Sequence, residues 1–122
     1  MLTINNKSVK IKYKLKQKGG FIMMMLNSLI LEGVIKNEVE VKETKEGVTV
    51  ASFKVGYTRY YKNLSGEEKE EESIFDVECY GHLAEVIAKY SKNRKNVRIV
   101  GKLKKKGNKV LISAEHIEFK AK

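Results

Sequence analysis

The chain has 122 residues, which is enough for one domain with its own hydrophobic core. Its single cysteine excludes an internal disulfide and a cysteine-rich metal site, and no apolar run approaches the ~18 residues that a membrane-spanning helix needs. The formal net charge of +10 favours a polyanionic partner but does not decide between nucleic acid and anionic lipid. We therefore expect a cytoplasmic protein whose surface attracts polyanions.

The charge is unevenly distributed along the chain. Residues 1–25 contain six lysines and no acidic residue, and ten basic residues lie between Glu85 and Glu115 without an acidic one. Five glutamates crowd into residues 67–72. We interpret the acidic run as a solvated surface. The second basic tract is a candidate binding surface, because its basic residues occupy alternate strand positions beside aromatic residues.

Residues 1–24 differ from the rest of the chain. The alternation from Val9 to Lys16 is compatible with a basic strand that Gly19 and Gly20 interrupt, and three consecutive methionines end at Met25. Two explanations remain open: translation starts at one of these methionines, so that the upstream residues are an annotation error, or residues 1–24 form a real basic arm. In both cases we expect the binding domain to span residues 25–122.

The first strands follow from alternating hydrophobicity. Leu26–Val34 is predicted as a strand with apolar residues on both faces, which indicates contact with another subunit. Val39–Thr44 continues the alternation, and Lys45–Gly47 forms a turn before a long strand at Val48–Tyr61. Residues 62–72, which include the five glutamates, are expected to form a polar loop.

Residues 73–101 change from strand to helix and back to strand. The alternation over residues 73–80 predicts a strand whose core face carries Phe75, Val77 and Cys79. Over residues 82–90 the apolar residues recur at helical spacing, which predicts a short helix with one apolar stripe. That stripe consists of Leu83, Val86, Ile87 and Tyr90.

After a polar turn, alternation returns from Asn96 to Leu103 and, beyond a short turn at residues 106–108, from Lys109 to Phe119. The predicted fold class is therefore all-β with one short helix between the third and fourth of five strands. This is the pattern of the five-stranded oligonucleotide-binding barrel, or OB-fold. In such a barrel the helix can plug one end while the strands carry the binding surface.

Four short blocks resemble the bacterial and phage single-stranded DNA-binding proteins, and they occur in the family's order. The blocks are Asn27–Gly33, Val50–Phe53, Tyr80–Val86 and Val97–Leu103, and the resemblance covers residues 25 to about 119. It implies an OB-fold homo-oligomer, a tetramer or a dimer, that binds single-stranded DNA without strong sequence preference. It also implies a nucleoid-associated protein of DNA replication, recombination and repair.

The resemblance also implies where bases stack. The family uses aromatic residues late in the second strand, at both ends of the third strand and in the last hairpin. Tyr60 and Tyr80 occupy two of these positions, whereas Ile74 replaces an aromatic residue and the hairpin at residues 104–109 has none. Each missing platform should cost ~1–3 kcal/mol, which lysine–phosphate contacts can offset. The candidate nucleic-acid-binding residues are Lys54, Arg59, Tyr60, Tyr61, Lys62, Ile74, Tyr80, His82, Arg98, Lys102, Lys104, Lys105 and Lys106.

Catalytic function is not expected. His82 and His116 have no neighbouring residues at metal-ligand spacing, and Cys79 alternates with core residues as an inert thiol does. The sequence contains no phosphate-cradling glycine motif and no nucleophile motif. We therefore predict a protein that is not an enzyme and that uses neither a metal nor a cofactor.

Two other functions remain open. Family members that recruit repair enzymes carry an acidic tail with an apolar tip, whereas this chain ends at Lys122 directly after the last predicted strand. Recruitment by such a tail is therefore not expected. One alternative is a primosome-type or RNA-binding adaptor on the same fold. The other is a protein-interaction barrel whose basic face meets an acidic partner.

Overall fold

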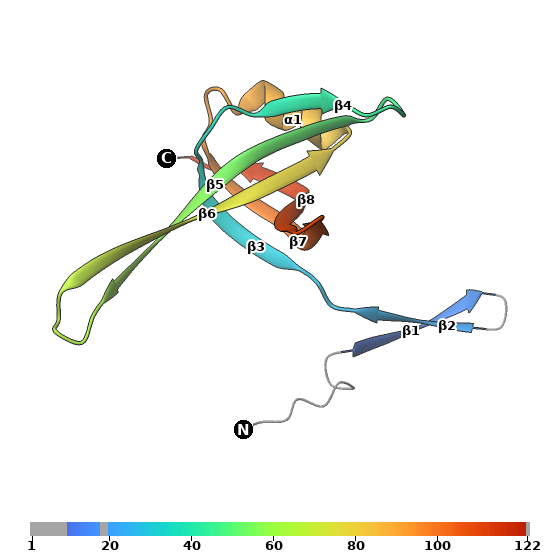
Figure 1. Ribbon diagram of the computed structural model, residues 1–122, viewed down its shortest axis with the longest axis horizontal. Coiled ribbons are helices and arrows are strands. Elements are labelled where there is room, and N and C mark those ends of the chain that lie inside the picture. The colour runs from blue at the N-terminus through green and yellow to red at the C-terminus, as the bar shows by residue number, and fades with distance from the viewer. Residues whose placement is uncertain (1–9, 18–19, 122) are drawn as a thin grey trace.

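The computed structural model describes residues 10–17 and 20–121, which form one helix, a two-stranded sheet and a six-stranded sheet (Figure 1). The predicted N-terminal extension includes residues 1–9, which lie outside the described residues. The elements in chain order are β1 (Lys10–Gln17), β2 (Gly20–Met25), β3 (Leu29–Ile35), β4 (Glu40–Glu43), β5 (Thr49–Lys62), β6 (Glu68–Tyr80), α1 (His82–Tyr90), β7 (Asn96–Lys106) and β8 (Lys109–Phe119).

The six-stranded sheet closes into a barrel. Its strand order is β3-β7-β8-β6-β5-β4, and β3 also pairs with β5 through Val34 opposite Gly56 and Ile35 opposite Val55. Five strands therefore form a closed ring, and β4 is added along β5. Every pair in this sheet is antiparallel except β6 with β8. The predicted OB-fold is confirmed.

Two glycines allow the strands of the barrel to approach each other closely. A Cβ at Gly33 of β3 would lie 2.4 Å from the carbonyl oxygen of Gly56 on β5. A Cβ at Gly101 of β7 would lie 2.2 Å from the carbonyl oxygen of Ser113 on β8. Both distances are too short for a side chain against backbone, so glycine is needed where the strands cross.

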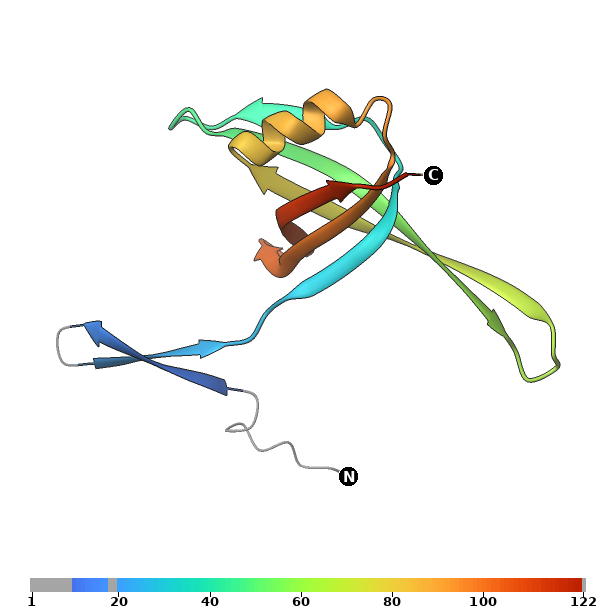
Figure 2. The same ribbon diagram turned by 180° about the vertical axis from the view of Figure 1, so that it is seen from behind.

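Alternate residues of the strands fill the barrel, and the helix closes one end of it. Phe53 and Val55 of β5 and Val77 of β6 are almost fully buried, as are Ile99 of β7 and Ile112 of β8. The helix α1 adds Ala84 and Ile87, both without exposed surface, and contacts β4, β5, β6 and β8 (Figure 2). The apolar stripe predicted from helical spacing faces the core through Ile87 and Leu83, whereas Tyr90 at its end is 44% exposed.

The acidic run corrects one prediction. Residues 68–72, predicted as part of a polar loop, are strand: they pair with residues 58–62 of β5 in a long hairpin that projects beyond the barrel (Figures 1 and 2). Opposite charges bridge this region, since Glu71 lies 3.5 Å from Arg59 and Glu72 lies 2.9 Å from Lys36. These cross-strand partners stabilise glutamates that have a low intrinsic strand propensity.

Phe75 and the first strand also differ from prediction. Phe75 is predicted in the core, but it is 38% exposed. It precedes Val77 and Glu78, the residues at which β6 pairs with β8. The first barrel strand begins at Leu29 rather than Leu26. Before it, the Asn27 amide donates to the Leu103 carbonyl oxygen at 2.8 Å and accepts from the Leu103 N–H at 2.9 Å. The Asn27 side chain thus replaces backbone pairing with β7.

Among the described residues, no helix is both long enough and apolar enough to cross a membrane.

Candidate nucleic-acid interface

Three candidate stacking residues share the outer face of the β5–β6 ribbon. Tyr60, Ile74 and Tyr80 are 74%, 53% and 37% exposed, and the register places Ile74 opposite Gly56 and Tyr80 opposite Val50. All these positions have the parity opposite to that of the core residues Phe53 and Val77. At ~3.3 Å per residue, Tyr60 and Ile74 lie about 13 Å apart along the ribbon, and Ile74 and Tyr80 about 20 Å apart.

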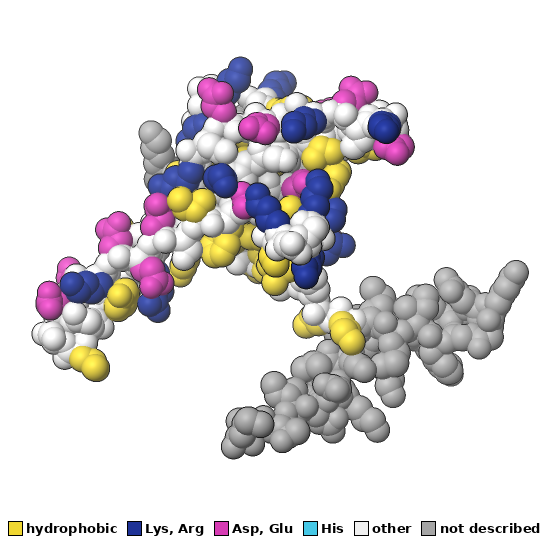
Figure 3. All heavy atoms as spheres, viewed as in Figure 1, with side chains coloured by type: hydrophobic (Ala, Val, Ile, Leu, Met, Phe, Trp, Pro, Cys, Tyr) yellow, Lys and Arg dark blue, Asp and Glu magenta, His cyan; other side chains and the backbone are white. Residues whose placement is uncertain are grey.

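Tyr60, Ile74 and Tyr80 form a stripe along this face, and a row of lysines lies beside its Tyr80 end. Lys102, Lys104 and Lys106 alternate along β7 and lie opposite Ser113, Leu111 and Lys109 of β8. All three lysines are exposed, and Ile112 of β8 belongs to the core, so the lysines lie on the outer surface. Figure 3 shows basic side chains gathered around the end of the β7–β8 hairpin, whereas acidic and basic side chains alternate along the β5–β6 hairpin. Lys105 occupies the other face of β7, opposite Val110.

Tyr80 is fixed by its neighbours on this surface. The Lys104 ammonium lies 4.9 Å from the centre of the Tyr80 ring and donates to the Tyr80 hydroxyl at 3.0 Å. This hydrogen bond raises the pKa of Lys104. The Tyr80 hydroxyl in turn donates to a carboxylate oxygen of Glu78. The aromatic ring and one lysine of the row are therefore held together, with the ring half exposed.

Two carboxylates lie among the lysines. Glu78 is only 5% exposed, and its oxygens lie 3.2 Å from Lys106 and 3.7 Å from Lys104. Burial alone would raise the pKa of Glu78, but hydrogen bonds from Tyr80 and Lys106 hold it below its ordinary value. The carboxylate is therefore ionised at neutral pH.

Asp76 is the second of these carboxylates. Its oxygens lie 2.8 Å from Lys54 and 3.2 Å from Lys109. The hydrogen bond from Lys54 is the main reason that the pKa of Asp76 is lowered. Asp76, Glu78 and Lys109 were not among the residues predicted for the site. The alternation placed both acids on the outer face, but nothing local signalled their contact with β7 and β8.

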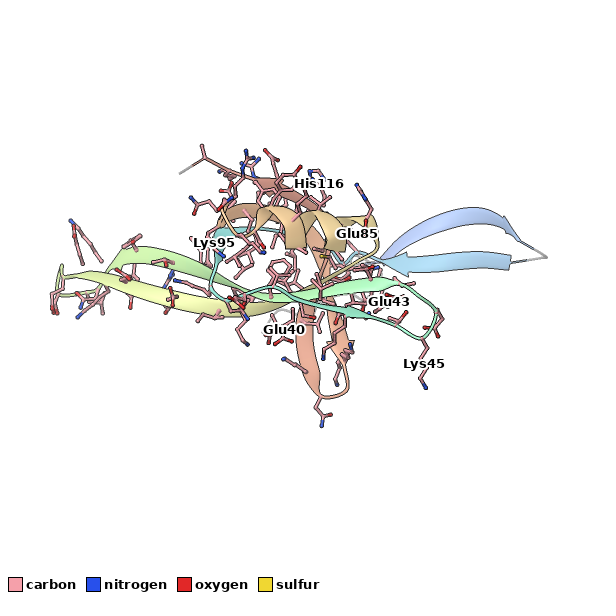
Figure 4. All side chains as sticks on the ribbon, turned by 90° about the horizontal axis from the view of Figure 1, so that it is seen from above. Glu40, Glu43, Lys45, Glu85, Lys95 and His116 are labelled. Carbon is pink, nitrogen blue, oxygen red and sulfur yellow. The ribbon has the colours of Figure 1, made fainter. Side chains whose placement is uncertain are left out.

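A shallow cavity of about 320 Å³ opens beside these ion pairs. It lies between the segment before β4, the outer faces of β5 and β6, and the β7–β8 hairpin. Its polar lining consists of Asn37, Glu40, Ser52, Lys54, Asp76, Glu78, Lys106 and Lys109. Figure 4 shows Glu40 on the same side of the sheet as the projecting β7–β8 hairpin. Phe53, Val77 and Leu111 complete the lining, so the cavity combines an apolar floor with a mostly charged rim.

The remaining predicted residues of the β5–β6 hairpin face partly in another direction. The Arg59 guanidinium lies 4.6 Å from the centre of the Tyr61 ring, on the face of the hairpin opposite to Tyr60. Tyr61 is 39% exposed, and Lys62 pairs with Glu68 near the end of the hairpin. The hairpin thus presents one tyrosine on the stripe and a stacked Arg–Tyr pair behind it.

Arg98 and His82 lie in separate surroundings. Arg98 lies 2.8 Å from Glu32 and 3.7 Å from Glu118, on the outer side of β3, β7 and β8. Arg98 is six residues before Lys104 on β7, which corresponds to about 20 Å. His82 is exposed at the start of α1, with Nδ1 3.6 Å from a Glu85 carboxylate oxygen. The ion pairs of both residues are thus with acids other than Asp76 and Glu78.

The surroundings of Cys79 argue against thiol chemistry. Cys79 has no exposed surface, and burial, together with the charge of Glu78, raises the pKa of its thiol to about 12. A thiol that stays protonated at neutral pH is a poor nucleophile and a poor metal ligand. In the described part of the chain, no group of three or more His, Cys, Asp or Glu side chains is arranged to hold a metal ion. Figure 4 places His116 near α1, away from the end of the β7–β8 hairpin.

Known proteins are similar to this chain in sequence and in fold. Single-stranded DNA-binding protein 1 of Chlorobaculum tepidum is 31% identical over 78 residues, which is 64% of this chain and 48% of that protein. The chain thus spans about half the length of this relative and of the single-stranded DNA-binding proteins of Wolinella succinogenes and Helicobacter hepaticus.

Two solved structures show the same fold. The SSB of Plasmodium falciparum, solved in complex with single-stranded DNA, superimposes with a TM-score of 0.70 at 20% identity, over 80% of this chain and 97% of that one. PriB of Ralstonia solanacearum gives a TM-score of 0.64 at 17% identity, over 77% of this chain and 97% of that one. The model of the single-strand binding protein family matches residues 26–110. The chain therefore belongs to the single-strand binding protein family.

Proposed function

We propose that this protein binds and protects single-stranded DNA without strong sequence preference during DNA replication, recombination and repair. The observation that carries the proposal is the junction of an exposed aromatic stripe, Tyr60 to Tyr80, with the lysine row of β7 on one face of an OB barrel. Membership of the family supports it, as does the fold shared with an SSB that was solved with single-stranded DNA.

The proposed mechanism separates stacking from charge. Exposed rings such as Tyr60 and Tyr80 accept any base, because every base has a flat π-face. Lys102, Lys104 and Lys106 contact phosphates, which carry no base information. Neither contribution discriminates strongly among sequences, and neither requires a chemical step. The protein acts by binding and not as an enzyme, and a location at the nucleoid follows from its ligand.

The working unit is proposed to be a homo-oligomer, a tetramer or a dimer, built from residues 25–122. The outer side of β3 and the segment before it support this, since Ile30 of β3 is 70% exposed and Leu26, which precedes the strand, is 74% exposed. Apolar side chains at this exposure on neighbouring positions are typical of an interaction surface. Sedimentation of the purified protein tests the assembly, and a monomer at working concentration would contradict it.

A competition assay tests the proposed function. A labelled single-stranded oligonucleotide bound to the protein is competed with unlabelled single-stranded DNA, duplex DNA and single-stranded RNA of matched length. We expect single-stranded DNA of any composition to compete best. Equal competition by duplex DNA would mean that charge alone attracts the ligand. The same assay on a protein that begins at Met25 shows whether residues 1–24 contribute.

A primosome-type or RNA-binding adaptor is the second candidate. It is favoured by the fold shared with PriB, whose whole length the chain nearly covers. It is also favoured by Ile74, an aliphatic residue in the middle of the stripe. Stronger competition by RNA than by single-stranded DNA in the same assay would select this function.

A further inference from the structure

Carboxylates occupy the centre of the proposed binding face. Glu78 contacts Lys104 and Lys106, and Asp76 contacts Lys54 and Lys109, at distances between 2.8 and 3.7 Å. Glu78 and Asp76 are two residues apart on β6, so their side chains lie on the same face of the strand, and both line the same cavity. Four lysines of this surface are thus paired with two acids before any ligand arrives.

Glu78 differs from an ordinary surface acid. Its side chain is 6% exposed, whereas the paired Lys104 and Lys106 are 41% and 64% exposed. The carboxylate therefore lies beneath the two ammonium groups, which remain accessible from solvent. A phosphate can approach these lysines from outside without displacing any backbone, and it then competes with Glu78 for the same N–H donors.

These ion pairs reduce the electrostatic attraction between the lysines and the phosphates of a nucleic acid. A lysine that already neutralises a carboxylate offers less electrostatic attraction to a phosphate than an unpaired lysine. The carboxylates also repel the approaching phosphates. For single strands, the slope of log K against log salt is about −0.7 per phosphate neutralised. The measured slope therefore gives the number of effective charges.

We propose that Glu78 and Asp76 are affinity-limiting residues of the binding face, which compete with phosphates for the lysines. In this role Glu78 also positions Tyr80, whose hydroxyl donates to it. The proposal rests on the proposed function, because it concerns single-stranded nucleic acid bound on this face. Removing the buried charge of Glu78 should therefore strengthen the binding of single-stranded nucleic acid.

The chain offers matched variants for the test. Glu78→Gln keeps the shape and an oxygen that can accept from Tyr80, but it removes the charge. Asp76→Asn likewise keeps the shape and removes the charge, at a less buried position. Glu32→Gln is the control, since Glu32 also bridges two cations, Arg98 and Lys120, but lies on the outer side of β3. Thermal unfolding of each variant shows whether it is folded.

Titrations of a labelled oligothymidylate measure affinity as a function of salt. We expect Glu78→Gln to bind roughly three- to tenfold more tightly at about 50 mM salt and to steepen the salt dependence by about 0.7 logarithmic units. Asp76→Asn should change both quantities in the same direction. The Glu32→Gln control should leave both unchanged.

Three outcomes would overturn the proposal while leaving the proposed function intact. One is unchanged affinity and salt dependence in folded Glu78→Gln and Asp76→Asn. Another is weaker binding by Glu78→Gln at constant salt dependence, since Glu78 would then act only by placing Tyr80. The third is equal tightening in Glu32→Gln, which would indicate a general charge effect. If the unaltered protein does not bind the oligonucleotide at all, the proposed function itself is wrong. Should Glu78→Gln not fold, Asp76→Asn decides the question.

Discussion

Tyr60 and Tyr80 lie on one face but are presented differently. Tyr60 stands on the projecting part of the β5–β6 hairpin and is 74% exposed, whereas Tyr80 is held by Glu78 and Lys104 at the barrel. The common face was predictable from parity along two strands. The contacts that hold Tyr80 were not, because Lys104 reaches it from a strand 24 residues later in the chain.

This difference gives separate expectations for the two rings. Tyr60→Ala and Tyr80→Ala should each weaken single-strand binding by ~1–3 kcal/mol, the usual value of one stacked base. Tyr60→Ala should leave the melting temperature almost unchanged because the ring is exposed. Ile74→Trp should tighten binding by adding a platform on the same face. Fluorescence titration and thermal unfolding measure both effects, and a large loss of stability in Tyr60→Ala would contradict the assignment of its ring to the surface.

At the scale of elements, the hydrophobic periodicity of the sequence predicted the bounds of one helix and one strand. The helix His82–Tyr90 and the last strand Lys109–Phe119 have the bounds that periodicity indicated. The start of β6 was not predicted, because residues 68–72 form strand by pairing with residues 58–62 of β5, and Glu71 and Glu72 gain cationic partners, Arg59 and Lys36, only in the folded protein. Strand formation there depends on tertiary context more than on intrinsic propensity. The β3–β5 closure that completes the barrel was likewise implied by the resemblance and not by any local signal.

The close approach of β3 to β5 at Gly33 allows a prediction about stability. In Gly33→Ala the new Cβ would meet the Gly56 carbonyl oxygen and the Val55 side chain, at 2.4 and 2.7 Å. Relief requires β3 to move away from β5, so the free energy of unfolding should fall by about 1–3 kcal/mol. Urea unfolding measures the loss. Gly66→Ala is an informative control, because Gly66 has open space but a positive φ of 81°. If Gly33→Ala costs no more than Gly66→Ala, the crossing is not tight.

At the scale of the whole molecule, charge is distributed by element. The β7–β8 hairpin carries the lysine row, while the β5–β6 hairpin mixes acids and bases (Figure 3). The loop after α1 carries further cations, including Lys92 and Lys95. In Figure 4 Lys95 lies beside α1, and the β7–β8 hairpin projects from the other side of the sheet. Net charge alone predicted a polyanionic partner, but only the fold separates these two cationic regions.

This separation allows salt to distinguish a specific face from a diffuse field. Lys102→Ala with Lys104→Ala removes two cations from the proposed face, and Lys92→Ala with Lys95→Ala removes the same charge from the helix side. The first pair should flatten the dependence of log K on log salt by on the order of 1 to 1.5 units, because about 0.7 is expected per phosphate contact. The second pair should flatten it much less. Base preference should change in neither, since phosphates carry no base information. Titrations between about 50 and 200 mM salt give both slopes. Equal changes from the two pairs would mean that overall positive charge attracts the nucleic acid and that the face around Tyr80 is not the binding site.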